Sequence, residues 1–78
     1  MGVREDVLGV ICNVLDVGED QVKMEQNLYD CLGVDSTEMV ELSVSLAKKF
    51  GIKLEQREIT NKHTPFQISD IIEKKKNN

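Results

Sequence analysis

Apolar residues recur at spacings of three and four along three stretches of this 78-residue chain, and this period limits its fold more than any other feature. A period of 3.6 residues places apolar side chains on one face of a helix, whereas a strand alternates every second residue. A chain this short can build only one modest core, so its helices must share it. The sequence therefore predicts a single all-α domain over residues 1–78.

The first stretch predicts a helix over residues 3–16 that stops near Gly18. Its apolar stripe consists of Val3, Val7, Val10, Ile11, Val14 and Leu15. Residues 17–34 hold scattered apolar residues without sustained helical phase, and we expect a long loop there. The side chains expected to anchor this loop on the core are Val22, Met24, Leu28 and Leu32.

A sharp start is predicted for the second helix at Asp35, whose carboxylate can accept a hydrogen bond from the N–H of Glu38. Glu38 can reach back to the N–H of Asp35, which completes a capping box. This helix should run to Phe50 and end at Gly51. Its apolar set is wider than one stripe, which indicates several neighbours or apolar side chains left for partners. The set comprises Met39, Val40, Leu42, Val44, Leu46, Ala47 and Phe50.

The last helix is signalled by Thr64, Pro65 and Gln67, because Thr-x-x-Gln is a capping box and Pro favours the first helical position. Its expected buried face holds Phe66, Ile68, Ile71 and Ile72. The segment Gln56–Thr60 is predicted to form a short helical turn. The fold class is therefore a small bundle of three longer helices plus one short helix, with a long loop between the first and second helices.

Composition and charge restrict where such a protein works. Hydrophobic residues make up 40% and charged residues 31% of the chain, as in a folded domain. No apolar run approaches the roughly 18 residues of a membrane span, and the first residues lack the order of a signal peptide. The net charge of −4 and the few aromatic residues disfavour nucleic-acid binding. We expect a cytoplasmic monomer without nucleic-acid partners or membrane insertion.

Several kinds of site are excluded by the pattern of residues. Cys12 and Cys31 are too few and too far apart for a disulfide scaffold or a zinc site, and both are expected to be small core residues. The acidic segment Asp16–Asp20 does not continue as a calcium loop. Glycine-rich phosphate-binding motifs are absent as well. We therefore predict no metal site.

Ser36 is the residue best placed for chemistry, because it lies in the first turn of the second predicted helix. Free N–H groups and the positive end of the helix dipole suit an attached phosphodiester there. On position alone, a plain cap or first-turn role is favoured. A catalytic serine needs a base and an orienting group, and the single histidine, His63, lies in a polar run and is expected to face solvent. No enzymatic activity is therefore predicted.

The segment Leu32-Gly33-Val34-Asp35-Ser36, followed by Val40-Glu41-Leu42, resembles the acyl carrier protein family. The resemblance continues through Phe50-Gly51-Ile52 and through residues 66–72, so it covers essentially the whole chain. The Asp-Ser pair alone is a weak signal. The pair together with Val-Glu-Leu at this spacing, in a chain of this length, is a strong one.

The resemblance implies a 4′-phosphopantetheine arm on Ser36, attached by a phosphopantetheinyl transferase that uses coenzyme A and magnesium. Asp35 matches the aspartate thought to position the transferase and its metal. The arm would carry acyl groups as thioesters to acyl-transferring and condensing enzymes in fatty-acid or specialised lipid or polyketide biosynthesis. In many members the acyl chain partly inserts among the helices. An aminoacyl or D-alanyl carrier, and a helical adaptor without the arm, are the alternatives.

The chain departs from the family pattern at Thr37, where Leu is frequent, and at Ala47, Lys48 and Lys49, where acids are frequent. The two lysines either favour the helix C-terminus through the dipole or discriminate among partners. Asp35, Glu38 and Glu41 remain as an acidic ridge. The residues expected to dock partners are Glu38, Glu41, Met39, Val44, Lys48 and Lys49.

Overall fold

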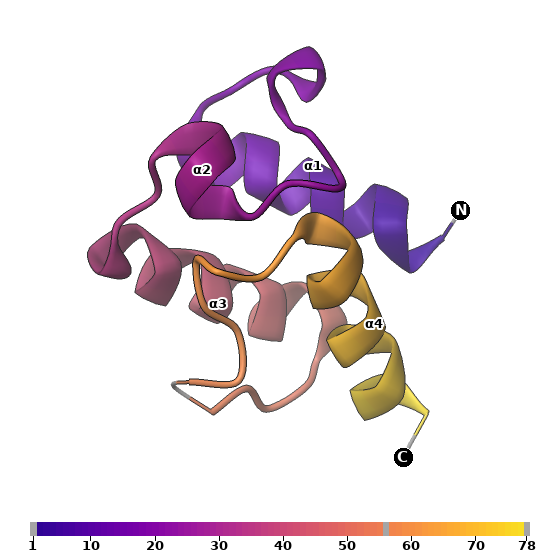
Figure 1. Ribbon diagram of the computed structural model, residues 1–78. Helices are drawn as coiled ribbons and strands as arrows, with labels where there is room; N and C mark the ends of the chain where they lie inside the picture. The colour runs from indigo at the N-terminus through magenta and orange to yellow at the C-terminus, as the bar shows by residue number, and fades with distance from the viewer. Residues whose placement is uncertain (1, 56, 78) are drawn as a thin grey trace.

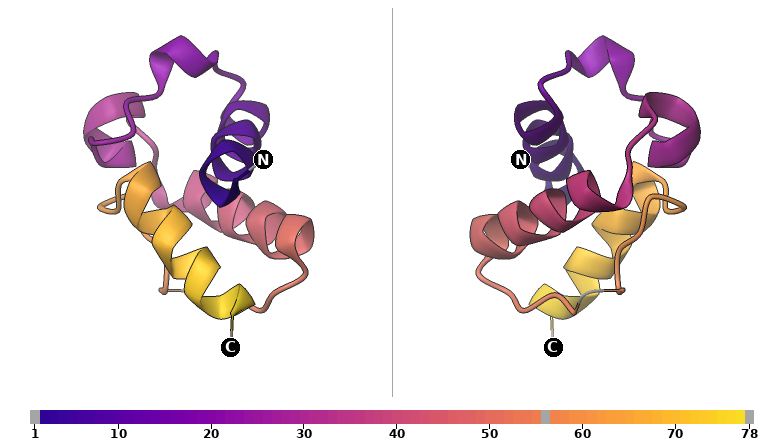
Figure 2. Two further views of the ribbon diagram at one scale, coloured as in Figure 1. Left: turned by 90° about the vertical axis from the view of Figure 1, so that its right-hand side faces the viewer. Right: turned by 90° about the vertical axis from the view of Figure 1, so that its left-hand side faces the viewer.

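Within residues 2–55 and 57–77, which the computed structural model describes, the chain consists of helices and loops (Figure 1). The elements are α1 (Val3–Leu15), the 3₁₀ helix η1 (Glu19–Gln21), α2 (Leu28–Leu32), α3 (Ser36–Phe50) and α4 (Pro65–Lys76). Helix α1 packs against both α3 and α4, and Figure 2 shows this arrangement from two sides. The predicted all-α bundle is confirmed. None of the described helices has the length and apolar character needed to cross a membrane.

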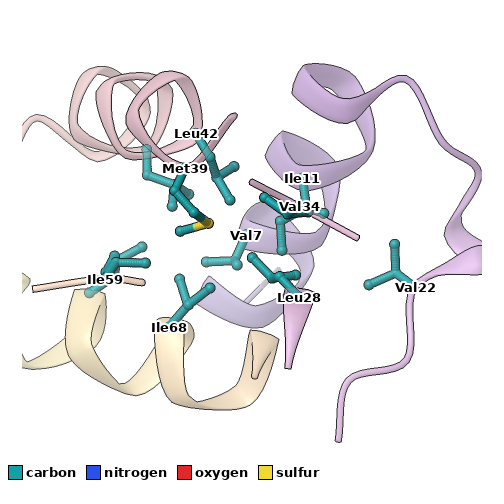
Figure 3. Close-up of a cluster of buried hydrophobic side chains, with 11 residues drawn as sticks. Val7, Ile11, Val22, Leu28, Val34, Met39, Leu42, Ile59 and Ile68 are labelled. Atoms are coloured by element: carbon teal, nitrogen blue, oxygen red, sulfur yellow. The ribbon is translucent and has the colours of Figure 1, made fainter. Parts of the chain in front are cut away.

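The core gathers buried side chains from all four α-helices and from the loops between them (Figure 3). Its members are Val7, Ile11, Val22, Leu28, Val34, Met39, Leu42, Leu46, Ile59, Ile68 and Ile72. Val22 and Leu28 anchor the connection after α1, as predicted. Leu32 is half-buried and packs against the core, whereas Met24 is half-buried without joining the cluster. Three of the four expected anchors therefore contact the core.

The predicted ends of α3 and α4 are confirmed atom by atom. Asp35 Oδ1 accepts from the N–H of Glu38 at 2.8 Å, and Glu38 Oε1 accepts from the N–H of Asp35 at 3.1 Å. Thr64 and Gln67 form the same reciprocal pair at α4, at 2.9 and 3.1 Å. Gly51, with φ of 63°, adopts the left-handed conformation that ends α3.

Helix α1 ends one residue earlier than predicted, and the residue that stops it is Asp16 instead of Gly18. The helix stops at Leu15, and Asp16 takes the left-handed conformation, with φ of 56°. Its N–H donates to the carbonyl of Cys12, and the N–H of Val17 donates to the same oxygen at 3.1 Å. Aspartate is among the few residues besides glycine that tolerate this conformation, so Gly18 is not needed as the stop.

The short helix lies in the first connection, at Leu28–Leu32, and not in the predicted segment after α3. Asn27 Oδ1 caps it by accepting from the N–H of Asp30 at 2.7 Å, and Gly33 ends it with φ of 66°. Arg57 and Glu58 form a turn instead of a helix, and Gln56 lies outside the described residues. A helix of one turn is too short to show a hydrophobic period, so the sequence pattern missed it.

The buried face of α4 differs from the prediction at one position. Ile68 and Ile72 are buried and Ile71 packs against the core, as expected. Phe66 is only half-buried, and the Arg4 guanidinium lies 4.5 Å from the centre of its ring. This cation–π contact ties the start of α1 to the start of α4.

The rotational orientation of α3 can be tested by shortening two of its side chains. Leu42 is fully buried, so Leu42→Ala should lower the free energy of unfolding by about 2–5 kcal/mol through lost burial and a residual cavity. Val44 is half-exposed, so Val44→Ala should cost less than about 1 kcal/mol. Urea denaturation followed by circular dichroism measures both changes. Equal losses would contradict this orientation of the helix.

Candidate functional site

Ser36 is the first residue of α3, and its side chain is exposed. Asp35 remains extended, with φ of −91° and ψ of 178°, so its capping box fixes the helix start one residue later. The N–H groups in the first turn of any helix lack intrahelical acceptors, and Asp35 satisfies only that of Glu38. The N–H groups of Ser36 and Thr37 therefore lie beside the serine hydroxyl at the positive end of the dipole. This setting suits a phosphate ester.

A groove of about 610 Å³ starts at Ser36 and follows one side of α3. Helix α3 lines it with Ser36, Met39, Val40, Ser43, Val44, Ala47 and Lys48. The segment between α3 and α4 forms the second wall with Leu54, Glu55, Arg57, Ile59, Thr60 and Asn61. Figure 1 shows this segment running below α3 before it rises to the start of α4. The volume lies within the range of small-molecule sites, roughly 300–1,000 Å³.

The second wall is fixed near Ser36 by Asn61. Its side-chain Nδ2 donates to the carbonyl of Val34 at 2.7 Å, and its own carbonyl accepts from the N–H of Tyr29 at 2.9 Å. Ile59, two residues earlier, is buried in the core. One asparagine therefore joins this wall both to α2 and to the residues that immediately precede α3.

Lys75 of α4 holds the same wall from the other side. Its Nζ donates to the carbonyl of Lys53 at 2.9 Å and forms an ion pair with Glu58 Oε1 at 2.8 Å. The hydrogen bond from Lys75, together with one from the N–H of Glu55, lowers the pKa of the Glu58 carboxyl. Glu58 is therefore held in its charged form, and the pair attaches the wall to α4.

The residues expected to dock partners do not all lie on one face. Val40 and Val44 are each 50% exposed, and Lys48 is exposed on the same side of α3. Met39, which is expected to dock partners, is only 6% exposed and belongs to the core. Val40, which is not among the expected docking residues, is more exposed than Met39. Lys49 is exposed on another side of the helix, which borders α1.

Glu41 and Glu38 differ in how freely they can meet a partner. Glu41 is exposed, whereas Glu38 is half-buried and its carboxylate is engaged by the N–H of Asp35. The acidic ridge therefore presents Asp35 and Glu41 most openly, while Glu38 also maintains the helix start.

The two cysteines contribute to packing and hydrogen bonding. Cys12 is half-buried against the core, and burial raises the pKa of its thiol, with nearby acidic side chains adding to the rise. A raised pKa keeps the thiol protonated and poorly nucleophilic. Cys31 Sγ donates to the carbonyl of Gln21 at 3.3 Å and accepts from the N–H of Lys23 at 3.4 Å. Cys31 thus helps to pin the first connection.

His63 is half-buried and does not simply face solvent, as the sequence suggested. Its Nδ1 accepts from the N–H of Thr60 at 2.9 Å, and its carbonyl accepts from the N–H of Leu28 at 3.3 Å. The histidine therefore stabilises the turn before α4 and its contact with α2.

The comparisons with known proteins give the family. The family model described as "Phosphopantetheine attachment site" matches residues 5–72. An acyl carrier protein from Campylobacter fetus subsp. fetus is 35% identical over 72 residues, which cover 92% of this chain and 90% of the relative. Another from Thermotoga maritima is 34% identical over 79 residues, covering 96% and 98%. The chain belongs to the acyl carrier protein family.

This acyl carrier protein carries acyl groups on covalently attached 4′-phosphopantetheine and is not itself an enzyme. Family membership implies a phosphopantetheinyl transferase and enzymes that handle acyl groups as its partners. The resemblance seen in the sequence is thus confirmed over most of the chain.

The ion pair between Lys75 and Glu58 predicts that the stability of the protein depends on pH. Lys75→Met should destabilise the protein near neutral pH, and the loss relative to the wild type should shrink as the pH falls. The pKa of Glu58 is lowered on folding, so its contribution is present above the ordinary glutamate pKa of about 4.3 and disappears as the pH falls through the lowered value. Thermal unfolding between neutral and acidic pH measures the difference, with Lys74→Met as the exposed control. A difference that does not change with pH would contradict a role for this pair.

Proposed function

We propose that Ser36 bears the 4′-phosphopantetheine arm. Its position at the exposed start of α3, where the groove opens, supports this assignment. The other serines fit less well, because Ser43 and Ser45 are half-buried in the middle of α3. Ser69 is buried and donates to the carbonyl of Pro65 at 2.9 Å. When attached, the group supplies the thiol that forms the thioester.

Asp35 is proposed to have two roles. Its Oδ1 caps α3 through the N–H of Glu38, which holds Ser36 at the first helical position. Its exposed carboxylate is also proposed to position the transferase and its metal, as the family resemblance implies. Asn at this position would retain the cap but remove the charge, so the two roles are separable.

The groove along α3 is proposed to receive the acyl chain. Its apolar lining comes from both walls, with Val40 and Val44 on α3 and Leu54 and Ile59 opposite. An acyl chain that lies against these side chains removes apolar surface from water, at roughly 25 cal/mol per Å². Ser36 itself is part of the groove lining, so an arm on Ser36 would start beside the groove.

The exposed face of α3 is proposed to dock the partner enzymes. Glu41 and the half-exposed Val40 and Val44 supply an acidic and an apolar contact. Lys48 and Lys49 are proposed to discriminate against enzymes whose docking patches are basic, since like charges across an interface suppress wrong partners. Such discrimination favours a role in a specialised lipid or polyketide pathway over general fatty-acid synthesis. We also propose that the protein is a cytoplasmic monomer.

Mass spectrometry tests the attachment residue. Incubation with coenzyme A, magnesium and a broad-specificity phosphopantetheinyl transferase should add one phosphopantetheinyl group to the wild type and to Thr37→Ala. Ser36→Ala should gain no mass, because the accepting hydroxyl is missing. A gain that survives Ser36→Ala would contradict the assignment, and the absence of any gain would favour a helical adaptor. Exclusive loading of the holo form by aminoacyl ligases would contradict the lipid or polyketide pathway.

The proposed discrimination by charge can be measured with a housekeeping fatty-acid synthase. Lys48→Glu combined with Lys49→Glu should raise kcat/KM by about threefold or more at low salt, because electrostatic attraction speeds docking. The control variant, Lys53→Glu with Lys74→Glu, makes the same change in net charge outside α3 and should have little effect on kcat/KM. Unchanged kinetics in the first variant would show that the lysines do not act as a filter.

A further inference from the structure

The lining of the groove is charged as well as apolar. Lys48 of α3 and Arg57 of the opposite wall both contribute to it, and both are exposed. Lys48 lies twelve residues beyond Ser36 on the same helix, which corresponds to about 18 Å along the axis. Glu55 is the carboxylate in the lining. The charged side chains of the groove therefore sum to one net positive charge.

The two cations are available to a ligand. Among the residues that the structure describes, neither Lys48 nor Arg57 forms an ion pair, whereas Lys75 is paired with Glu58. Folding does not require a cation at either position, because both side chains are exposed. Lys48 sits in the last turn of α3, where the dipole favours a cation, but the dipole gives no reason for Arg57 on the facing wall.

The lining mixes apolar and polar residues. Val40 and Val44 are half-exposed even without a ligand, and Ser43 lies between them along the helix. Thr60 and Asn61 add polar groups to the facing wall. Thr60 Oγ1 already accepts from the N–H of Lys62 at 3.2 Å, and Asn61 Nδ2 donates to the carbonyl of Val34 at 2.7 Å, so the charged side chains are the polar part of the lining that can select among acyl groups. A shorter acyl group with a polar end meets both kinds of lining.

We propose that this groove prefers acyl groups that end in a carboxylate, held by Lys48 and Arg57, over saturated acyl groups of equal length. This inference rests on the proposed attachment at Ser36 and on the groove as the acyl site. The carboxylate supplies the charge that complements the two cations, while its methylene groups lie against Val40 and Val44. Glu55 opposes the preference and limits its size.

The test compares hexanoyl and adipoyl groups, which have the same number of carbon atoms and differ only in the terminal carboxylate. A broad-specificity transferase loads each group from its acyl-coenzyme A onto Ser36, and mass spectrometry confirms complete loading. Hydroxylamine then cleaves the thioester, and the rate for the free acyl-coenzyme A divided by the rate for the loaded protein gives the protection factor. Adipoyl should be protected about threefold more than hexanoyl, as expected for exposed ion pairs, and the preference should weaken with salt.

Matched variants decide which charges are responsible. Lys48→Gln with Arg57→Gln should abolish the preference, and Glu55→Gln should increase it. Lys53→Gln with Lys74→Gln removes two charges outside the groove lining and should preserve it. On fully loaded protein, equal protection of both acyl groups would overturn the inference. A preference that survives the loss of Lys48 and Arg57 would overturn it as well. A failure to load Ser36 would instead overturn the proposed function, and the inference with it.

Discussion

The helical phase of α3 is the constraint on which the rest of the structure depends. Once the helix starts at Ser36, residues such as Leu42 and Leu46 turn into the core, where α1 packs against α3. They belong to the same buried cluster as Ile68 and Ile72 of α4. The same rotation leaves Val40 and Val44 outside the core, where they line the groove. One helix thus supplies both the centre of the fold and a wall of the candidate site. In a domain with so small a core, the position of the site follows from the packing of this single helix.

The parts of the fold that the sequence predicts are those whose interactions are local. The capping boxes at Asp35 and Thr64 join atoms only three residues apart, so the residue types reveal both helix starts. Helix α2 is different, because its first N–H groups, those of Leu28 and Tyr29, donate to carbonyls of residues 61–63. No local pattern indicates such contacts. The sequence pattern therefore predicts a short helix at Gln56–Thr60, where the structure has none among the described residues, and misses the one at Leu28–Leu32.

The candidate site, too, is only partly predictable from the sequence. Ser36 and its exposed position follow from the helix start, but the groove requires a second wall that folds back along α3. That wall is positioned by the hydrogen bond from Asn61 to Val34, which are 27 residues apart in the sequence. No local sequence pattern predicts a contact over this separation. Within α3, neighbouring positions differ by about 100° around the axis. That rotation sends Met39 into the core and Val40 into solvent, a distinction that a broad apolar set does not make.

The composition of the groove is largely independent of what holds the protein together. Val40, Val44, Lys48 and Arg57 are exposed, so other residues at these positions would change the free energy of folding little. The proposed acyl group would cover the half-exposed Val40 and Val44, and its proposed carboxylate would meet the two cations of the same lining. Met39 and Ile59 belong to both the core and the groove lining, but Val40, Val44, Lys48 and Arg57 lie outside the core, so substitutions at these four positions can alter the groove without changing the core.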